Sequence, residues 1–148
     1  MMMIEALMAV LIFAVGVLGL VGINSIATNS QSDALYRSEA NRLANEMVNN
    51  IWVNADRPNG SAISLTAFSH RADATSPCDP STGTVSTNAV VTGWLSEVKS
   101  AGLRGLPGAA NLGQQIVVDA DNKVTVTVCW QAPSDSWARK HVVISFIS

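Results

Sequence analysis

The chain has 148 residues, of which 48% are hydrophobic and only 14% are charged, and its net charge at pH 7 is −2. This length allows one globular domain and one long helix, and the charged fraction is low for a wholly soluble domain. Phosphate binding needs clustered Lys and Arg, and the sequence has no basic run, so we expect no nucleic-acid partner.

The apolar surplus lies at the N-terminus. Residues 6–23 contain no charged side chain, a run of about eighteen residues that is near the lower limit for crossing a bilayer. Glu5 stands at the head of this run, and an ionisable group at the edge of an apolar span is costly unless it has a partner. Glu5 is therefore a candidate functional residue. The alternative is a signal anchor in which Glu5 only lies at the interface; a cleaved signal peptide fits poorly, because a basic segment and a small-residue cleavage site are missing.

Helical spacing continues beyond the apolar run. No proline interrupts residues 1–57, so the sequence predicts one helix of roughly 53 residues, about 80 Å long. Residues 1–23 are expected to form its membrane or filament-core part, and residues 24–57 its amphipathic half, which packs on a folded domain. One apolar stripe supports this packing: Tyr36, Ala40, Leu43, Met47 and Ile51. Glu39, Arg42 and Glu46 are spaced for pairing on another face.

Three glycines lie inside the predicted helix, at Gly16, Gly19 and Gly22. Each weakens a helix interior by about 1 kcal/mol relative to Ala. They either let neighbouring helices approach closely or form a weak point where the helix can unwind, and both interpretations stay open.

Residues 58–112 are expected to form a connecting region. It begins as a long surface loop, with a short helical piece near residues 65–70. Asn88 is a candidate N-cap for a helix whose apolar side carries Trp94, Leu95 and Val98 and which ends near Gly102. A turn follows at residues 106–108.

Residues 113–148 are predicted to form an antiparallel β-meander with one covered face. Strands are expected at residues 115–118 and 124–130, followed by a last strand. In the second strand the alternation directs one set of residues at the long helix: Val124, Val126, Val128 and Trp130. In the last strand the predicted core face consists of Val142, Ile144 and Phe146, and His141 is expected to face solvent. The fold class predicted is therefore α+β.

The two cysteines, Cys78 and Cys129, are far apart in the sequence. An even cysteine count in an exported chain predicts a disulfide bond. Because Cys129 alternates with the helix-facing residues, the loop that carries Cys78 must cross the outer face of the sheet.

The sequence predicts no enzyme. His70 and His141 do not form a recognised metal-ligand spacing or nucleophilic constellation with the cysteines, and no phosphate-binding loop follows a strand. We expect no catalytic residue, no metal site and no cofactor.

The N-terminal residues also carry a resemblance. The segment Ile4-Glu5-Ala6-Leu7, leading into Gly16-Val17-Leu18-Gly19-Leu20, resembles the N-terminus of a mature type IV pilin, and most closely the PilV family of minor pilins. The similarity continues at residues 36–47, at Trp94, at residues 106–108 and at residues 124–130. The family usually begins with an N-methylated Phe, whereas this chain has Met1, and Gly22 stands where many pilins carry a helix-breaking Pro.

The resemblance implies the pilin fold, a long N-terminal helix packed on a C-terminal antiparallel sheet. It implies a minor subunit of a type IV pilus, processed by a prepilin peptidase, held in the bacterial inner membrane with its C-terminal domain in the periplasm, and then assembled by the pilus machinery into an extracellular filament with other pilin subunits. It further implies effects on adhesion and twitching motility, and it assigns Glu5 and the amino group of Met1 on a neighbouring subunit to assembly. The alternatives are a pseudopilin of a type II secretion system, a membrane-anchored binding module whose loop 62–87 recognises a ligand and, as the weakest, a membrane-anchored enzyme.

Overall fold

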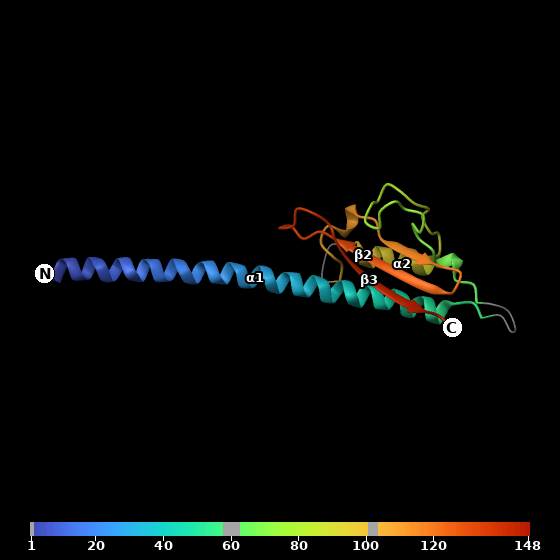
Figure 1. Cartoon of the computed structure of the whole chain (residues 1–148), viewed down its shortest axis with the longest axis horizontal. Helices are drawn as coiled ribbons and strands as arrows, with labels where there is room; N and C mark the ends of the chain where they lie inside the picture. The colour runs from blue at the N-terminus through green and yellow to red at the C-terminus, as the bar shows by residue number, and fades with distance from the viewer. Residues whose placement is uncertain (1, 58–62, 101–103) are drawn as a thin grey trace. The chain divides into compact units, whose positions relative to one another are not determined.

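The computed structural model describes residues 2–57, 63–100 and 104–148, and the chain divides into two compact units, residues up to Leu35 and Tyr36–Ser148. The structure confirms the α+β class (Figure 1). The elements in chain order are the helix α1 (Met2–Asn54), the 3-10 turn η1 (Thr66–Phe68), the helix α2 (Ala89–Val98), the 3-10 turn η2 (Ala109–Asn111), and the strands β1 (Gln115–Val118), β2 (Lys123–Trp130) and β3 (Arg139–Phe146).

α1 is one helix of 53 residues, as the absence of proline predicted. Its polar middle part forms internal hydrogen bonds. The Thr28 hydroxyl donates to the Asn24 carbonyl oxygen at 2.7 Å, and the Ser32 hydroxyl donates to the Thr28 carbonyl oxygen at 3.1 Å. These bonds satisfy short polar side chains that would otherwise compete for the backbone.

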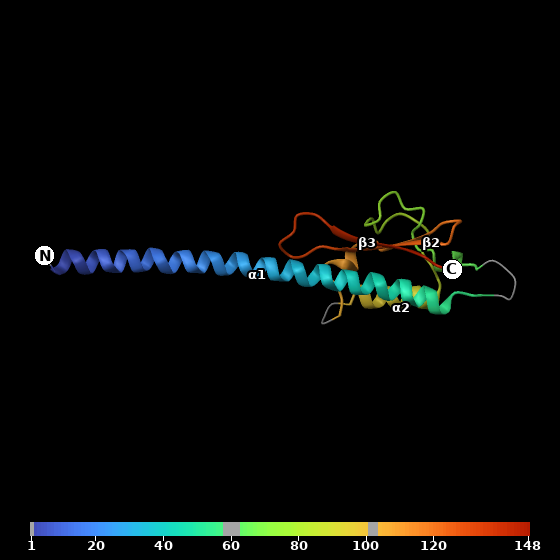
Figure 2. The same cartoon turned by 60° about the horizontal axis from the view of Figure 1, so that its bottom comes forward.

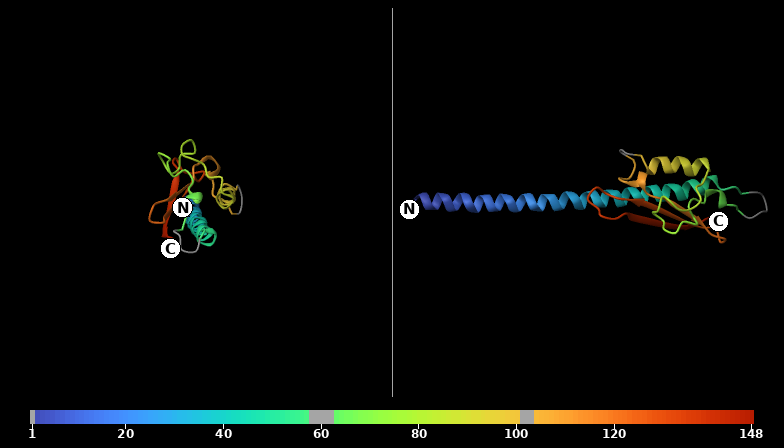
Figure 3. Two further views of the ribbon diagram at one scale, coloured as in Figure 1. Left: turned by 90° about the vertical axis from the view of Figure 1, so that its right-hand side faces the viewer. Right: turned by 90° about the horizontal axis from the view of Figure 1, so that it is seen from above.

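The unit Tyr36–Ser148 has two layers, with α2 beside the second part of α1 and both helices on one face of the sheet (Figures 2 and 3). The predicted stripe is confirmed: Ala40, Leu43, Met47 and Ile51 are fully buried, and Tyr36 is partly buried against them. The indole N–H of Trp94 in α2 donates to the Leu43 carbonyl oxygen of α1 at 2.8 Å, which fixes the two helices to each other.

The ends of α2 follow capping chemistry. The Asn88 side chain accepts a hydrogen bond from the Val90 backbone N–H at 2.9 Å, as predicted for an N-cap. The helix ends at Val98, earlier than expected, and Gly102 lies outside the described residues. The predicted helical piece at residues 65–70 is only the short turn η1.

The sheet has the order β1-β2-β3, and both pairs are antiparallel. The predicted inner face of β2 is confirmed, since its four helix-facing side chains are buried. Gln114, which precedes β1, extends the pairing with its side chain. Its amide nitrogen donates to the Cys129 carbonyl oxygen at 3.0 Å, and its amide oxygen accepts from the Cys129 N–H at 2.7 Å.

The predicted orientation of β3 was wrong. Val142, Ile144 and Phe146 lie on the outer face and are 43%, 58% and 67% exposed. The register pairs Val143 with Val126 and His141 with Val128, and directly paired residues share a face of the sheet. Val143 and His141 are therefore on the side of the helices, and His141 does not face open solvent.

Part of the outer face of β2 is covered, as expected from the predicted crossing of the loop that carries Cys78. Thr127 and Cys129 point to the outer face of β2, yet they are 3% and 0% exposed. The segment that carries Cys78 lies against this part of the outer face, because Cys78 forms a disulfide bond with Cys129.

Candidate functional site

The first candidate site is the apolar segment of α1. Every described residue from Met2 to Ile23 is exposed, and large side chains such as Phe13 and Leu18 are each 72% exposed. The helix is long and apolar enough to cross a membrane. A continuous apolar surface of this size is rarely left in water, so lipid or another protein is needed to cover it.

Glu5 lies in the first turn of α1 and is exposed. A carboxylate in this position interacts favourably with the positive end of the helix dipole, which contributes about 0.3–1 kcal/mol at an exposed site. This small stabilisation explains why the helix can carry a carboxylate at position 5. It does not give the chain a need for one. The predicted partner, the amino group of Met1 on a neighbouring subunit, lies outside the described residues.

The three glycines differ in their angular position around the helix axis relative to Glu5. Each residue advances about 100° around the axis, so Gly16 and Gly19 lie within about 40° of Glu5, whereas Gly22 is about a quarter turn away. A Cβ atom at any of the three would meet no atom of the described residues within 4 Å. Contacts within this chain therefore do not explain the glycines, and the helix continues through all of them.

The second candidate is the segment between residues 63 and 87. Cys78 and Cys129 form a disulfide bond, with their Cα atoms 5.6 Å apart and a sequence separation of 51. A loop of this size corresponds to about 4 kcal/mol of stabilisation in the loop-entropy model, although measured values are often lower. The Gly113 N–H donates to the Cys78 carbonyl oxygen at 3.0 Å beside the bridge. The bridge thus fixes the segment to the sheet.

Polar contacts also order this segment internally. Asp73 accepts hydrogen bonds from the backbone N–H and the hydroxyl of Thr84, at 2.7 and 2.9 Å, and these bonds lower the pKa of its carboxyl. The disulfide bond and these hydrogen bonds hold the segment in one conformation. The segment is therefore a poor candidate for a loop that closes over a ligand.

His70 is a buried part of the same segment and is 3% exposed. Burial lowers the pKa of its imidazole to about 4, with smaller contributions from the charges of Arg71 and Lys99. Its Nδ1 accepts a hydrogen bond from the Ser86 N–H at 3.1 Å, which requires the neutral ring. His70 therefore has a structural role in fastening the segment.

An ion-pair cluster on α1 joins the two helices. Arg42 contacts Glu39 and Glu46 as predicted, at 2.7 and 2.5 Å, and it also contacts Glu97 of α2 at 3.0 Å. The hydrogen bond with Glu39 is the largest of the interactions that raise the pKa of Arg42. The contact with Glu97 could not be expected from local spacing.

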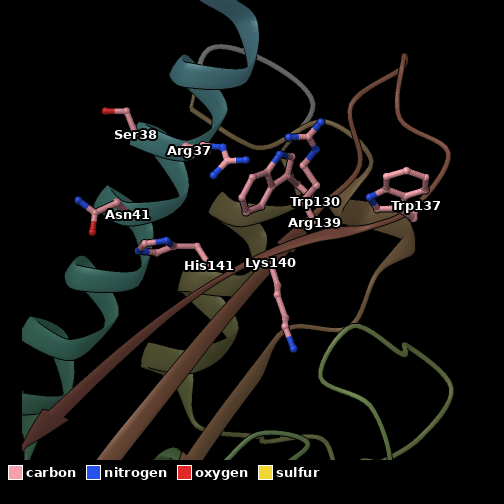
Figure 4. Close-up of a pocket in the computed structure, with 8 residues that line it drawn as sticks. All are labelled: Arg37, Ser38, Asn41, Trp130, Trp137, Arg139, Lys140 and His141. Carbon is pink, nitrogen blue, oxygen red and sulfur yellow. The ribbon is translucent and has the colours of Figure 1, made fainter. Parts of the chain in front are cut away.

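A third site was missed by the sequence analysis. It is an open groove of about 720 Å³ between α1 and the start of β3, lined by side chains that include Arg37, Trp130, Trp137, Arg139 and His141 (Figure 4). The alternation of β3 carried a signal, because Arg139 and His141 share a face. The other face of β3 carries Val142, Ile144 and Phe146, which are more apolar, and this face was therefore predicted to be the buried one.

Comparison of the chain with protein-family models, with curated proteins and with solved structures found no match.

Proposed function

We propose that this chain is a structural subunit of a type IV pilus, of the minor, PilV-like kind. It is held in the bacterial inner membrane with residues 36–148 in the periplasm, and it then polymerises into an extracellular filament through its N-terminal helix. The observation that carries the proposal is the exposed apolar segment from Met2 to Ile23, whose only charged side chain is Glu5.

Two features support polymerisation over simple anchoring. A membrane span needs only about 20 residues, whereas α1 has 53 residues and buries none before Ala40. A plain anchor also has no need of a carboxylate inside its apolar end. In an array of such helices, Glu5 would face the α-amino group of a neighbouring subunit, and the desolvated pair would favour one axial register.

The disulfide bond supports the location of the domain. Disulfides persist in oxidising compartments such as the periplasm and the cell surface, and Cys78 and Cys129 are joined. The proposal includes roles in pilus assembly, adhesion and twitching motility, with other pilin subunits, the prepilin peptidase and the assembly machinery as partners.

The proposal is tested by fractionation. Filaments are sheared from cells that express the tagged chain and are pelleted, and peptides of the chain are quantified by mass spectrometry in the filament and membrane fractions. We expect the chain in both fractions, and in the membrane alone when the prepilin peptidase is deleted. A chain that stays in the membrane while filaments are abundant is an anchored binding module. A chain that pellets only when a type II secretion system is overproduced is a pseudopilin.

A further inference from the structure

The groove of the unit Tyr36–Ser148 is lined by two arginines and a histidine. Arg37 comes from α1, and Arg139 and His141 come from the inner face of β3. None of the described residues that line the groove is acidic. Arg37 and Arg139 bring two positive guanidinium groups to the groove, and Asp135 is ion-paired with the second of them. A local field of this sign attracts anions.

One of the arginines is held in position. The Nε and Nη2 atoms of Arg139 donate to the two carboxylate oxygens of Asp135, at 2.7 and 2.9 Å. This two-point contact sets the plane of the guanidinium group and turns Arg139 into a fixed donor rather than a flexible one.

Trp130 supplies a second, independent observation. Its side chain is 2% exposed, and its buried indole nitrogen has no hydrogen-bond partner among the described residues. In the view of Figure 4 the indole lies between the guanidinium groups of Arg37 and Arg139. Guanidinium groups have only donors, so neither arginine can accept the indole hydrogen. A buried donor that has no partner among the described residues calls for an acceptor from outside them.

The rest of the lining indicates what kind of molecule would bring that acceptor. Ser38 and Asn41 line the groove from α1 with a hydroxyl and an amide, groups that exchange hydrogen bonds with neutral hydroxyls. Trp137 presents an indole that is 72% exposed, a flat apolar surface on which a ring can lie. The volume of about 720 Å³ is that of a small-molecule site and is much larger than one carboxylate needs.

We infer that this groove binds an acidic saccharide. The carboxylate of a uronate unit lies between Arg37 and Arg139 and accepts the Trp130 indole hydrogen, its hydroxyls contact Ser38 and Asn41, and its ring lies against Trp137. The indole N–H of Trp130 is covered in the free chain, so binding requires a side-chain movement at the rim of the groove that admits the ligand oxygen. The inference does not depend on the filament role.

The test uses the full chain in detergent micelles, labelled with 15N, and a short oligogalacturonate as the probe. Binding is measured by calorimetry and by the NMR shift of the Trp130 indole N–H. The fully methyl-esterified probe removes the charge but keeps the rings. Arg37→Gln removes a charge from the groove. Lys140→Gln is the matched control, because Lys140 carries the same charge but points away from the other groove residues (Figure 4).

We expect saturable binding that moves the Trp130 resonance, at least tenfold weaker binding for Arg37→Gln and for the esterified probe, and unchanged binding for Lys140→Gln. Trp137→Ala, on an exposed loop, should weaken binding without changing the fold. The inference is overturned by absent binding at millimolar probe, or by equal losses in the two charge variants. It is also overturned if hexaglutamate binds more tightly, which would indicate an acidic peptide, or if inorganic phosphate moves the resonance equally, which would indicate an adventitious ion only.

Discussion

Glu5 is a residue at which charge and shape can be separated by substitution. Glu5→Gln keeps the size and shape of the side chain and removes its charge. If Glu5 pairs with an amino group between helices, both Glu5→Gln and Glu5→Ala should lower the amount of chain in sheared filaments at least tenfold, since a loss of about 1.4 kcal/mol changes an equilibrium tenfold. The membrane-bound amount should stay unchanged. Both amounts are measured by quantitative mass spectrometry.

Glu5→Asp provides the control, because it keeps the charge and shortens the reach. Intermediate incorporation is expected for it. Wild-type incorporation of Glu5→Gln would mean that Glu5 only interacts with its own helix end or with the interface, and the assembly proposal would lose its main physical support.

The lowered pKa of His70 predicts that the stability of the fold depends on pH. Its pKa is lowered from 6.5 to about 4 in the folded chain, so between these values the unfolded chain binds a proton that the folded chain does not. The free energy of unfolding should therefore fall as the pH is lowered from 6.5 to 4, by at most about 3 kcal/mol. The carboxyl groups of Asp73, Asp79, Asp119 and Asp135 have lowered pKa values, so the stabilisation that they contribute begins to be lost near the lower end of this window and is lost mainly below it.

The measurement is urea unfolding of the full chain in micelles at several pH values, followed by Trp fluorescence. His70→Asn places an amide oxygen near the Nδ1 position and cannot titrate, so its unfolding free energy should vary much less across the window. An equal dependence in wild type and His70→Asn would show that another group is responsible.

At the scale of elements, the glycines of α1 allow the two interpretations of the sequence to be separated. Gly16 and Gly19 lie near the Glu5 side of the helix, and Gly22 does not. Each Gly→Ala change should stabilise the helix by about 1 kcal/mol, and none creates a contact within the chain. If close helix packing is the reason, Gly16→Ala with Gly19→Ala should reduce filament incorporation, and Gly22→Ala should not.

Filament yield and helix content by circular dichroism are measured for both variants. If a weak point is the reason, the Gly22 variant should also lose incorporation. Normal incorporation of the triple Ala variant would show that the glycines are incidental.

The elements of the fold were predictable to different degrees. α1, the Asn88 cap and the inner face of β2 follow from local patterns that tertiary contacts reinforce. β3 was assigned to the wrong face because Val142, Ile144 and Phe146 are more apolar than the set that includes Arg139 and His141. Its orientation depends on the register with β2, and a shift of one residue exchanges the faces. That register is a property of the turn before β3, which apolarity alone does not encode.

At the scale of the whole molecule, the groove shows a further limit of sequence patterns. Its residues come from α1, from the end of β2 and from the start of β3, about 100 residues apart at the extremes. None of them belongs to a motif with a fixed spacing. The apolar segment with Glu5, by contrast, is continuous in sequence, so its candidate role could be proposed before the structure.

The division of the chain into two units predicts that the folded domain does not need the apolar segment. Every described residue of α1 before Asp33 is exposed, and the buried core begins at Ala40. A chain of residues 29–148 keeps two helical turns ahead of Tyr36, enough to absorb fraying of the new end. Its free energy of unfolding should equal that of the full chain in micelles within about 0.5 kcal/mol, as expected when only exposed groups are altered. The disulfide bond should also form.

The measurements are urea unfolding and light scattering without detergent. The shortened chain should remain monomeric and soluble, and it should not enter sheared filaments when it is expressed beside the full chain, because the surface that drives association has been removed. An unfolded shortened chain would show that residues before 29 stabilise the domain. Entry of a folded shortened chain into filaments would transfer the assembly role from the N-terminal helix to the unit Tyr36–Ser148.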